Sequence, residues 1–275
     1  MKPGVQRLVP AYEAAALAFL ALSPYDNVFL TWLIERERSS ATRAGLHVYL
    51  DADMRVRGVA FFGRQVVLAA DGERVVDAFA DAGSAFRFER MIVGPRSCVE
   101  PYWRRVRPWH APARIVRESQ PLLALQRGAL RANSDGVITR TARADEWKTI
   151  AKNSAEMIEH ELEYDPRSVS GDFGANVRAM IARGLWWVGE SDAGLCFFCN
   201  VGPSSRQTLQ LQGIWTPPEL RGRGLASKAL HGICAQLLDV HPTLSLYVNA
   251  FNANALALYE RVGFARCGEF ATILF

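Results

Sequence analysis

Residues 214–230 read IWTPPELRGRGLASKAL, where a short apolar segment runs through two prolines into a loop that alternates arginine and glycine. Pro217 and Pro218 prevent an upstream strand from continuing in its ladder, and the apolar pattern from Leu225 onwards predicts a helix. The loop between them then lies at a helix N-terminus, where unpaired backbone N–H groups and the helix dipole attract anions. Glycine lets a ligand approach the backbone closely, and the arginines add charge. The segment therefore predicts a cradle for a pyrophosphate.

Two common phosphate-binding loops do not match this segment. A P-loop needs GxxxxGK followed by Ser or Thr, whereas Ser227 and Lys228 stand in the opposite order after the wrong spacing. A dinucleotide fingerprint needs a third glycine where Ser227 stands, near the start of a parallel domain. What remains is the pattern Arg-x-x-Gly-x-Ala, which runs from Arg221 to Ala226 after a hydrophobic strand and Pro-x-x.

A second motif follows at residues 244–264, LSLYVNAFNANALALYERVGF. Its order predicts a strand, an asparagine turn, a helix over residues 253–262 and a Gly-Phe ending. Asn252 suits the helix start, and Gly263 is placed to end the helix in the left-handed conformation. The spacing puts Tyr259 on the same helix face as Leu256 and Val262.

Taken together, the two motifs resemble the GCN5-related N-acetyltransferase (GNAT) family, and within it bacterial two-domain members whose N-terminal half is a degenerate copy. The resemblance covers residues 136–275. It implies that an amine attacks the thioester of acetyl-CoA directly, with acetyl-CoA as co-substrate and no metal, and that strands 208–216 and 244–249 splay apart around the pantetheine arm. The residues that it assigns to acetyl-CoA are Ile214, Trp215, Thr216, Arg221, Gly222, Arg223, Gly224, Leu225, Ala226 and Asn252.

The expected fold is mixed α/β with two tandem GNAT-like domains, each a mostly antiparallel sheet with splayed parallel central strands flanked by helices. A length of 275 residues with 49% hydrophobic composition favours two domains. The polar segment LRANSDGV, residues 130–137, separates them, which gives a degenerate domain over residues 1–130 and a catalytic domain over residues 137–275. The first half repeats the predicted element order, but residues 92–97 (IVGPRS) replace the glycine and arginine loop and contain too few glycines to wrap a phosphate.

Catalysis requires a base, because an amine with a lysine-like pKa is mostly protonated at neutral pH. Many GNAT members carry a glutamate on the central strand, where this sequence has Gln210 and Gln212. Candidate bases come instead from the acidic stretch at residues 156–163, where Glu159 and Glu163 are the predicted catalytic carboxylates. His160 is a further candidate, and each of these groups would act through a water.

The resemblance also implies that the Tyr259 hydroxyl protonates the departing sulfur. Each assignment has a structural alternative. In the structural alternatives, Tyr259 only packs in the hydrophobic core and Asn252 only caps its helix. The two arginines would then lie in a solvated turn, and the acidic stretch would be a solvated helix face. An acidic stretch that does face the cleft favours a cationic acceptor.

The composition narrows the cellular compartment and the kinds of partner that we expect for this protein. The sequence contains five cysteines, and the pair Cys196 and Cys199 sits in GLCFFCNV, which indicates a buried strand rather than a metal or redox motif. No leader pattern and no run of about 20 apolar residues is present, so we expect a cytoplasmic protein without a membrane partner. The net charge of +4 does not favour a nucleic acid. We expect a small-molecule or peptide amine as acceptor, and the oligomeric state stays open.

Two alternatives remain at this point. The absence of the strand glutamate is also what a catalytically inactive CoA-binding sensor or interaction module would show. A second alternative is a nucleic-acid-associated role for the more basic N-terminal half, which steeply salt-dependent binding would reveal.

Overall fold

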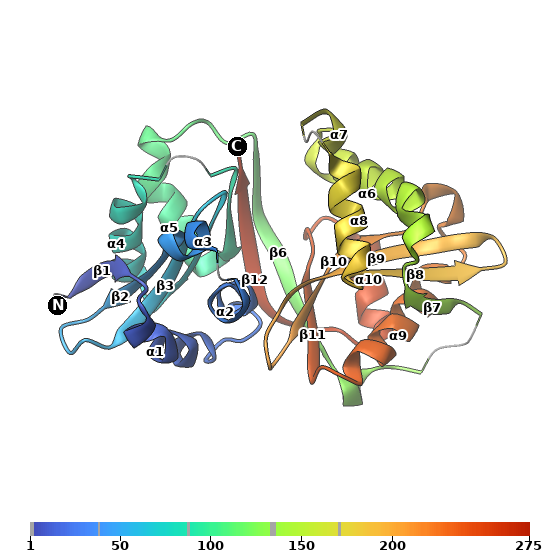
Figure 1. Cartoon of the computed structure of the whole chain (residues 1–275), viewed down its shortest axis with the longest axis horizontal. Helices are drawn as coiled ribbons and strands as arrows, with labels where there is room; N and C mark the ends of the chain where they lie inside the picture. The colour runs from blue at the N-terminus through green and yellow to red at the C-terminus, as the bar shows by residue number, and fades with distance from the viewer. Residues whose placement is uncertain (1–2, 38, 87–88, 133–135, 170–171) are drawn as a thin grey trace.

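The computed structural model describes residues 3–37, 39–86, 89–132, 136–169 and 172–275. These residues form a 12-stranded mixed sheet with helices on both faces (Figure 1). The strands are β1 Gly4–Arg7, β2 Leu46–Leu50, β3 Val56–Phe62, β4 Gln65–Ala70, β5 Met91–Pro95, β6 Ile115–Gln126, β7 Ile138–Thr141, β8 Trp186–Ser191, β9 Gly194–Ser204, β10 Leu209–Trp215, β11 Thr243–Tyr247 and β12 Ala265–Leu274. The helices are α1 Pro10–Leu20, α2 Val28–Arg36, α3 Ser40–Gly45, α4 Glu73–Gly83, α5 Arg96–Val106, α6 Trp147–Leu162, α7 Pro166–Val169, α8 Phe173–Ala182, α9 Leu225–Leu238 and α10 Ala253–Val262.

The strand order reveals a duplicated unit. The sheet runs β1-β2-β3-β4-β5-β12-β6-β11-β10-β9-β8-β7, so the first five strands of each half lie in mirrored order about the central pair. Each half has one parallel pair, β4 with β5 and β10 with β11, and the other neighbours are antiparallel. The predicted fold class, two like halves with a parallel central pair in each, is therefore confirmed.

The two halves exchange their sixth strands. The last strand of the chain, β12, pairs with β5 and β6, while β6 of the N-terminal half pairs with β11. Figure 1 shows β6 and β12 side by side at the middle of the molecule, where they join the two halves. The predicted domain limits at residues 130 and 137 remain a sequence prediction, and residues 133–135 between them lie outside the described residues. The sheet itself is continuous from the N-terminal half to the C-terminal half.

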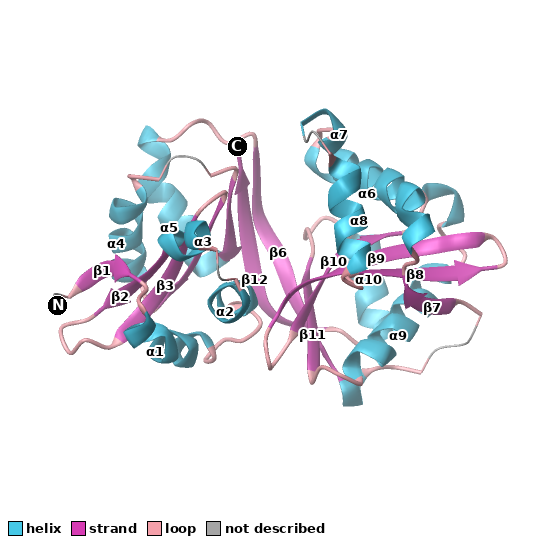
Figure 2. Ribbon diagram, in the orientation of Figure 1, coloured by secondary structure: helices cyan, strands magenta, loops and turns pink. Residues whose placement is uncertain are grey.

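Buried side chains gather in four clusters that follow the helices. In the C-terminal half, α9 and α10 pack on one face of the sheet, and α6 and α8 pack on the other. In the N-terminal half, α1 and α2 cover one face, while α4 and α5 cover the opposite face. Figure 2 shows these helices around the strands of each half. Cys196 and Cys199 are fully buried on β9, which confirms the interpretation of their segment as a core strand.

Several element limits differ from expectation. The sequence pattern predicts separate strands near residues 113–117 and 122–125, yet both segments belong to β6, which passes through Pro121. Pro121, which lacks an N–H, lies just before the point where β6 starts to pair with β11 at Leu122, and its carbonyl accepts from Val248 N–H. The same pattern predicts a strand over residues 88–93. It corresponds to β5, which starts at Met91, and residue 88 lies outside the described residues.

The N-terminal counterpart of the phosphate loop also lies elsewhere than expected. By topology β4 corresponds to β10, since each is the first strand of its parallel pair. The connection after β4 is therefore the counterpart, and it consists of Asp71 and Gly72 alone before α4 starts at Glu73. Two carboxylates at that helix start repel anions. The prediction that residues 92–97 are the counterpart of the glycine and arginine loop is therefore wrong, because those residues follow the next strand, β5. Neither segment gives the first half a phosphate cradle.

Candidate active site

The parallel strands β10 and β11 separate after two residue pairs. Leu209 lies opposite Leu244 and Gln210 opposite Ser245, and no further pair follows among the described residues. Irregular register between β10 and β9, together with Gly213 at a φ of 58°, bends β10 away from its parallel neighbour. The separation opens a central cleft of about 1310 Å³. Residues 211–216 all line this cleft.

The glycine and arginine loop lies along the wall of the central cleft. Gly222 and Gly224 both adopt a φ of 75°, and a Cβ at either position would meet no atom within 4 Å. Gly224 is the N-cap of α9 and has no side chain with which to cap this helix end. The first N–H groups of α9 have no partner within the helix, and the space beside both glycines is open. Gly222, Gly224, Leu225 and Ala226 all line the central cleft.

The two arginines of the loop have different positions. Arg221 lines the central cleft, stacks its guanidinium over the Trp215 ring at 4.4 Å and donates from Nε to the Thr216 carbonyl at 3.0 Å. Its terminal nitrogens stay available at the loop. Arg223 is exposed and is not among the residues that line the cleft. The structure thus brings Arg221 to the predicted cofactor site and leaves Arg223 at its margin.

The α10 helix supplies the opposite wall. The Asn252 side chain accepts a hydrogen bond from Ala255 N–H at 3.1 Å and so caps the helix, while its residue also lines the cleft. Gly263 ends the helix at a φ of 116°, and a Cβ there would lie 2.1 Å from the Ala129 carbonyl oxygen. Tyr259 is 6% exposed and packs its ring against Phe264. Burial raises the pKa of the Tyr259 phenol well above its usual value, so the hydroxyl stays protonated at neutral pH.

The predicted catalytic carboxylates lie at the end of α6. Glu163 lines the central cleft and ends the helix in the left-handed conformation, with its N–H donating to the Glu159 carbonyl at 2.9 Å. Glu159 instead lines a neighbouring outer hollow of about 430 Å³, together with Glu156, His160, Trp215, Pro218 and Arg221. The helix therefore directs its carboxylates toward two different spaces.

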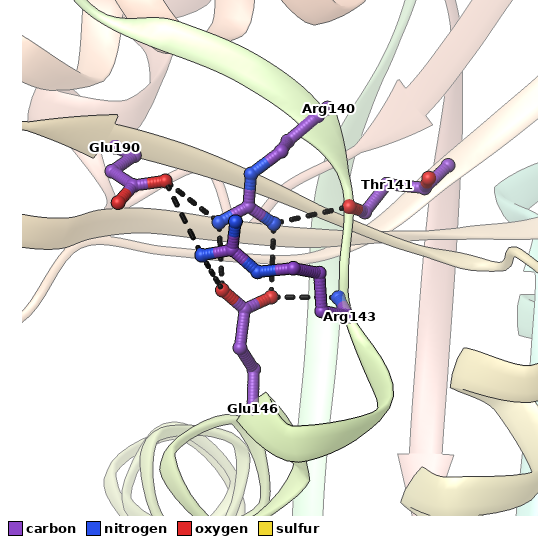
Figure 3. Close-up of polar contacts among 5 residues, drawn as sticks. All are labelled: Arg140, Thr141, Arg143, Glu146 and Glu190. Atoms are coloured by element: carbon purple, nitrogen blue, oxygen red, sulfur yellow. Dashed lines mark hydrogen bonds and ion pairs between the residues drawn. The ribbon is translucent and has the colours of Figure 1, made fainter.

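A cluster of ion pairs fixes the start of the same helix (Figure 3). Arg140 on β7 donates to Glu146, just before α6, and to Glu190 on β8, both at 2.7 Å. Arg143 N–H donates to the second Glu146 oxygen at 2.7 Å. The Arg140 hydrogen bond lowers the pKa of the Glu146 carboxyl, and the hydrogen bond to Glu146 raises the pKa of Arg140. These contacts tie the N-terminal end of α6 to the edge of the sheet.

Sequence reasoning missed the contribution of the N-terminal half. Because of the strand exchange, residues of β6 and β12 form one side of the central cleft. Gln120 donates to the Asn249 side chain at 2.9 Å and accepts from the Thr272 hydroxyl at 2.5 Å, which links β6, the end of β11 and β12 in one buried network. Arg117 of β6 also lines the cleft. No local signal could have placed these residues beside Tyr259.

The strand position of the absent glutamate is occupied by amides. Gln212 lines the central cleft and donates to the Gln210 side chain at 3.0 Å. Neither amide can take a proton at a useful pH, so a base must come from another element. No group of three or more His, Cys, Asp or Glu side chains in the described ranges could hold a metal ion. Across those same ranges, no helix has the length and apolar character to cross a membrane.

Comparisons with known proteins agree with this geometry. Residues 150–264 match the model of the acetyltransferase (GNAT) family, and residues 46–150 match a domain of unknown function, DUF4081. A curated acetyltransferase of Agrobacterium fabrum is 32% identical over 69 residues, which are 25% of this chain and 50% of that protein. The match thus spans about half the length of the curated relative.

Solved structures show the same fold over nearly the whole chain. A GCN5-related N-acetyltransferase of Sphaerobacter thermophilus is 15% identical with a TM-score of 0.62, covering 98% of this chain and 94% of the other. One from Kribbella flavida is 15% identical with a TM-score of 0.59, covering 94% and 95%. A tandem GNAT protein from the clavulanic acid biosynthesis pathway is 13% identical with a TM-score of 0.56 and covers 98% of each chain. Residues 150–264 of this chain therefore form a domain of the acetyltransferase (GNAT) family, and residues 46–150 before them form a DUF4081 domain.

Proposed function

We propose that this protein is an acetyl-CoA-dependent N-acetyltransferase. The observation that carries the proposal is the coincidence, in one cleft, of separated strands β10 and β11, an uncapped glycine loop and a buried tyrosine. The family transfers acyl groups, which supports the reaction class. The choice of acetyl-CoA as donor and of an amine as acceptor is our proposal.

The loop at the start of α9 fits the pyrophosphate of acetyl-CoA. Positive φ values at Gly222 and Gly224 turn the backbone toward the open space, and the N-terminal N–H groups of α9 are uncapped there among the described residues. Arg221 adds a cation beside them. The backbone of Ile214, Trp215 and Thr216 is no longer paired to β11 and can bind the amide groups of the pantetheine arm, apart from the Thr216 carbonyl, which accepts from Arg221. Asn252 lines the same cleft across from the loop.

The acyl transfer itself needs few groups. The acceptor ammonium loses a proton to a base, its nitrogen attacks the thioester carbonyl, and the C–S bond breaks as the sulfur takes a proton. Tyr259 suits the last role, because its raised pKa keeps a proton on the hydroxyl that it can donate to the leaving thiolate. The base belongs to the acidic end of α6, for which the sequence names Glu159 and Glu163.

The acceptor is proposed to be cationic. At the last turn of α6, Glu163 lines the central cleft and Glu159 lines the outer hollow, and Trp215 lines both spaces. Negative charge of this kind concentrates ammonium groups near the thioester. Free buried cysteines also suit a reducing compartment, which supports the expectation of a cytoplasmic protein.

A calorimetric titration with acetyl-CoA tests the cofactor site. The unsubstituted protein is expected to bind with a Kd in the micromolar range, and Arg221→Glu is expected to abolish the signal, since it puts a carboxylate at the phosphate cradle. Arg206→Glu makes the same charge change on the exposed β9–β10 turn and is expected to bind normally. Absence of binding by the unsubstituted protein at millimolar acetyl-CoA would refute the proposal.

Thiol release with a panel of amines tests the acceptor. The panel contains L-lysine, spermidine, ethanolamine and a short peptide with a free N-terminus, each mixed with acetyl-CoA and the full chain. Faster release with a dicationic amine than with ethanolamine is the expected result. Binding of acetyl-CoA without release in the presence of any amine would favour the inactive CoA-binding module over an enzyme.

A further inference from the structure

The acidic end of α6 contains a third carboxylate that sequence reasoning passed over. Glu161 lines the central cleft together with Tyr259, whereas Glu159 faces the outer hollow. The inference drawn from it rests on the function proposed above, because it concerns the group that deprotonates the acceptor.

Glu161 lies near the proposed acid of the reaction. Its negative charge contributes to the raised pKa of the Tyr259 phenol and also to that of Tyr247 on β11. Of the carboxylates in the last turn of α6, it is the one whose charge acts on these two phenols. The base must reach the amine nitrogen and the acid must reach the thioester sulfur. Because both atoms bond to the same carbonyl carbon during the reaction, the two groups must lie close together.

The N-terminal half holds Glu161 in place. Arg117 of β6 donates from Nη2 to the Glu161 carbonyl, and Arg114, just before β6, donates from Nη1 to the Leu162 carbonyl at 2.6 Å. These carbonyls are the unpaired acceptors at the C-terminus of α6, where positive charge is favourable. Arg114 also stacks over the Tyr164 ring, with 5.6 Å from its guanidinium to the centroid. The last turn of α6 is thus fixed by side chains more than 40 residues away in sequence.

The groups around Glu161 shift the pKa of its carboxyl in opposing directions. Glu161 is an exposed residue, but the cleft walls around it displace part of its water and so raise the pKa of its carboxyl, while the neighbouring Arg117 and His160 side chains lower it by a smaller amount. Tyr247 and Tyr259 face it from β11 and α10 with neutral phenols, and β10 contributes the neutral Gln212. The net effect is a carboxyl with a pKa above its ordinary value, closer to the pH at which an amine must lose its proton.

We propose that Glu161 is the catalytic base that accepts a proton from the acceptor ammonium group, and that Arg117 of the N-terminal half is its positioning residue. The Glu161 carboxylate takes one N–H proton and passes it to solvent. The neutral amine then forms the C–N bond, the C–S bond breaks, and the sulfur takes the Tyr259 proton. The excess proton of the new amide nitrogen returns to the Tyr259 oxygen through water. The balance is one ammonium and one thioester converted into one amide, one thiol and one released proton.

This assignment gives the DUF4081 domain a role in catalysis. Its strand β6 reaches the cleft because β6 pairs with β11 of the other half, and Arg117 points from that strand to the end of α6. The first half lacks a phosphate cradle of its own, yet it supplies the contact that orders the base of the second.

The first test compares glutamine variants of the full chain by acetyl-CoA calorimetry and by the pH dependence of kcat/KM, using the fastest amine of the panel above. Glu161→Gln is expected to keep its acetyl-CoA affinity, lower kcat by about 100-fold or more and lose the acidic limb of the profile. Glu260→Gln, an exposed residue of α10 outside the cleft, removes the same charge and is expected to retain normal kinetics.

Retention of the acidic limb in Glu161→Gln would overturn the assignment. So would a limb that disappears in Glu163→Gln or Glu159→Gln while Glu161→Gln keeps it. An unsubstituted protein that neither binds acetyl-CoA nor releases thiol would instead refute the proposed function, which is a different result from a fully active Glu161→Gln.

The second test addresses Arg117. Arg117→Gln removes a charge that lowers the pKa of Glu161, so the acidic limb is expected to move to higher pH. Arg117→Lys keeps the charge and is expected to restore the limb to its original position. A limb that stays in place in both variants would show that Arg117 has no influence on the base.

Discussion

At the scale of a single residue, the Tyr259 hydroxyl separates an enzyme from a binding module. Its ring is buried and packs against Phe264, so replacement by phenylalanine keeps the packing and removes one oxygen. We expect Tyr259→Phe to lower kcat by about 100-fold, because the thiolate then leaves without a proton donor, and to leave acetyl-CoA affinity unchanged. Calorimetry and thiol release measure the two quantities separately. Equal loss of binding and turnover would mean that the tyrosine only supports the wall of the cleft.

At the scale of an element, α6 is held at both ends, by Glu146 at its start and by the arginines of β6 at its end. Glu146 has a side chain 9% exposed and three hydrogen bonds from Arg140 and the Arg143 N–H. We expect Glu146→Gln to lower the free energy of unfolding at neutral pH by about 2 kcal/mol, as for other hydrogen bonds to charged groups. Urea denaturation measures this difference. Glu190→Gln, whose side chain is 36% exposed, serves as the matched control with a smaller expected loss.

The same carboxylate predicts a dependence of stability on pH. The pKa of Glu146 is lower in the folded chain than its usual value, so its ionised form stabilises the fold above the unfolded-state pKa of about 4.3. That contribution disappears as the pH falls through the lower pKa of the folded state. We therefore expect the unfolding free energies of the unsubstituted protein and of Glu146→Gln to converge on acidification. Urea denaturation at a series of acidic pH values measures this, and a constant difference between the two proteins would contradict it.

The sequence predicts an element well when the residues that determine it lie close together in the chain. The limits of α9 and α10 coincide with expectation because Gly224, Asn252 and Gly263 mark them within a few residues. The exchange of β6 and β12 could not be predicted, since it pairs segments about 150 residues apart through backbone groups that any sequence provides. Glu161 was overlooked for the same reason: its neighbour Arg117 belongs to the other half of the chain.

At the scale of the whole molecule, the exchange makes each half incomplete without the other. In the N-terminal half, the position between β5 and β6 is occupied by β12 of the other half. The β12 side chains Phe270, Ala271 and Ile273 complete the hydrophobic cores of the N-terminal half. We expect residues 1–132 and residues 136–275 to be insoluble or unfolded when produced separately and to co-elute as one species when produced together. Size-exclusion chromatography with circular dichroism measures this. A separately produced N-terminal segment that melts cooperatively as a monomer would show that β6 can fold back onto β5.

The position of β12 also has a consequence for the order of events during synthesis. A ribosome makes β12 well after β5 and β6, yet this strand lies between those two in the sheet. The nascent N-terminal half therefore keeps an open strand edge until β12 has been made, and such edges invite pairing with other chains. Pairing over so long a sequence separation is also slow. Newly made chains of this protein are consequently most exposed to aggregation in the interval before β12 emerges from the ribosome.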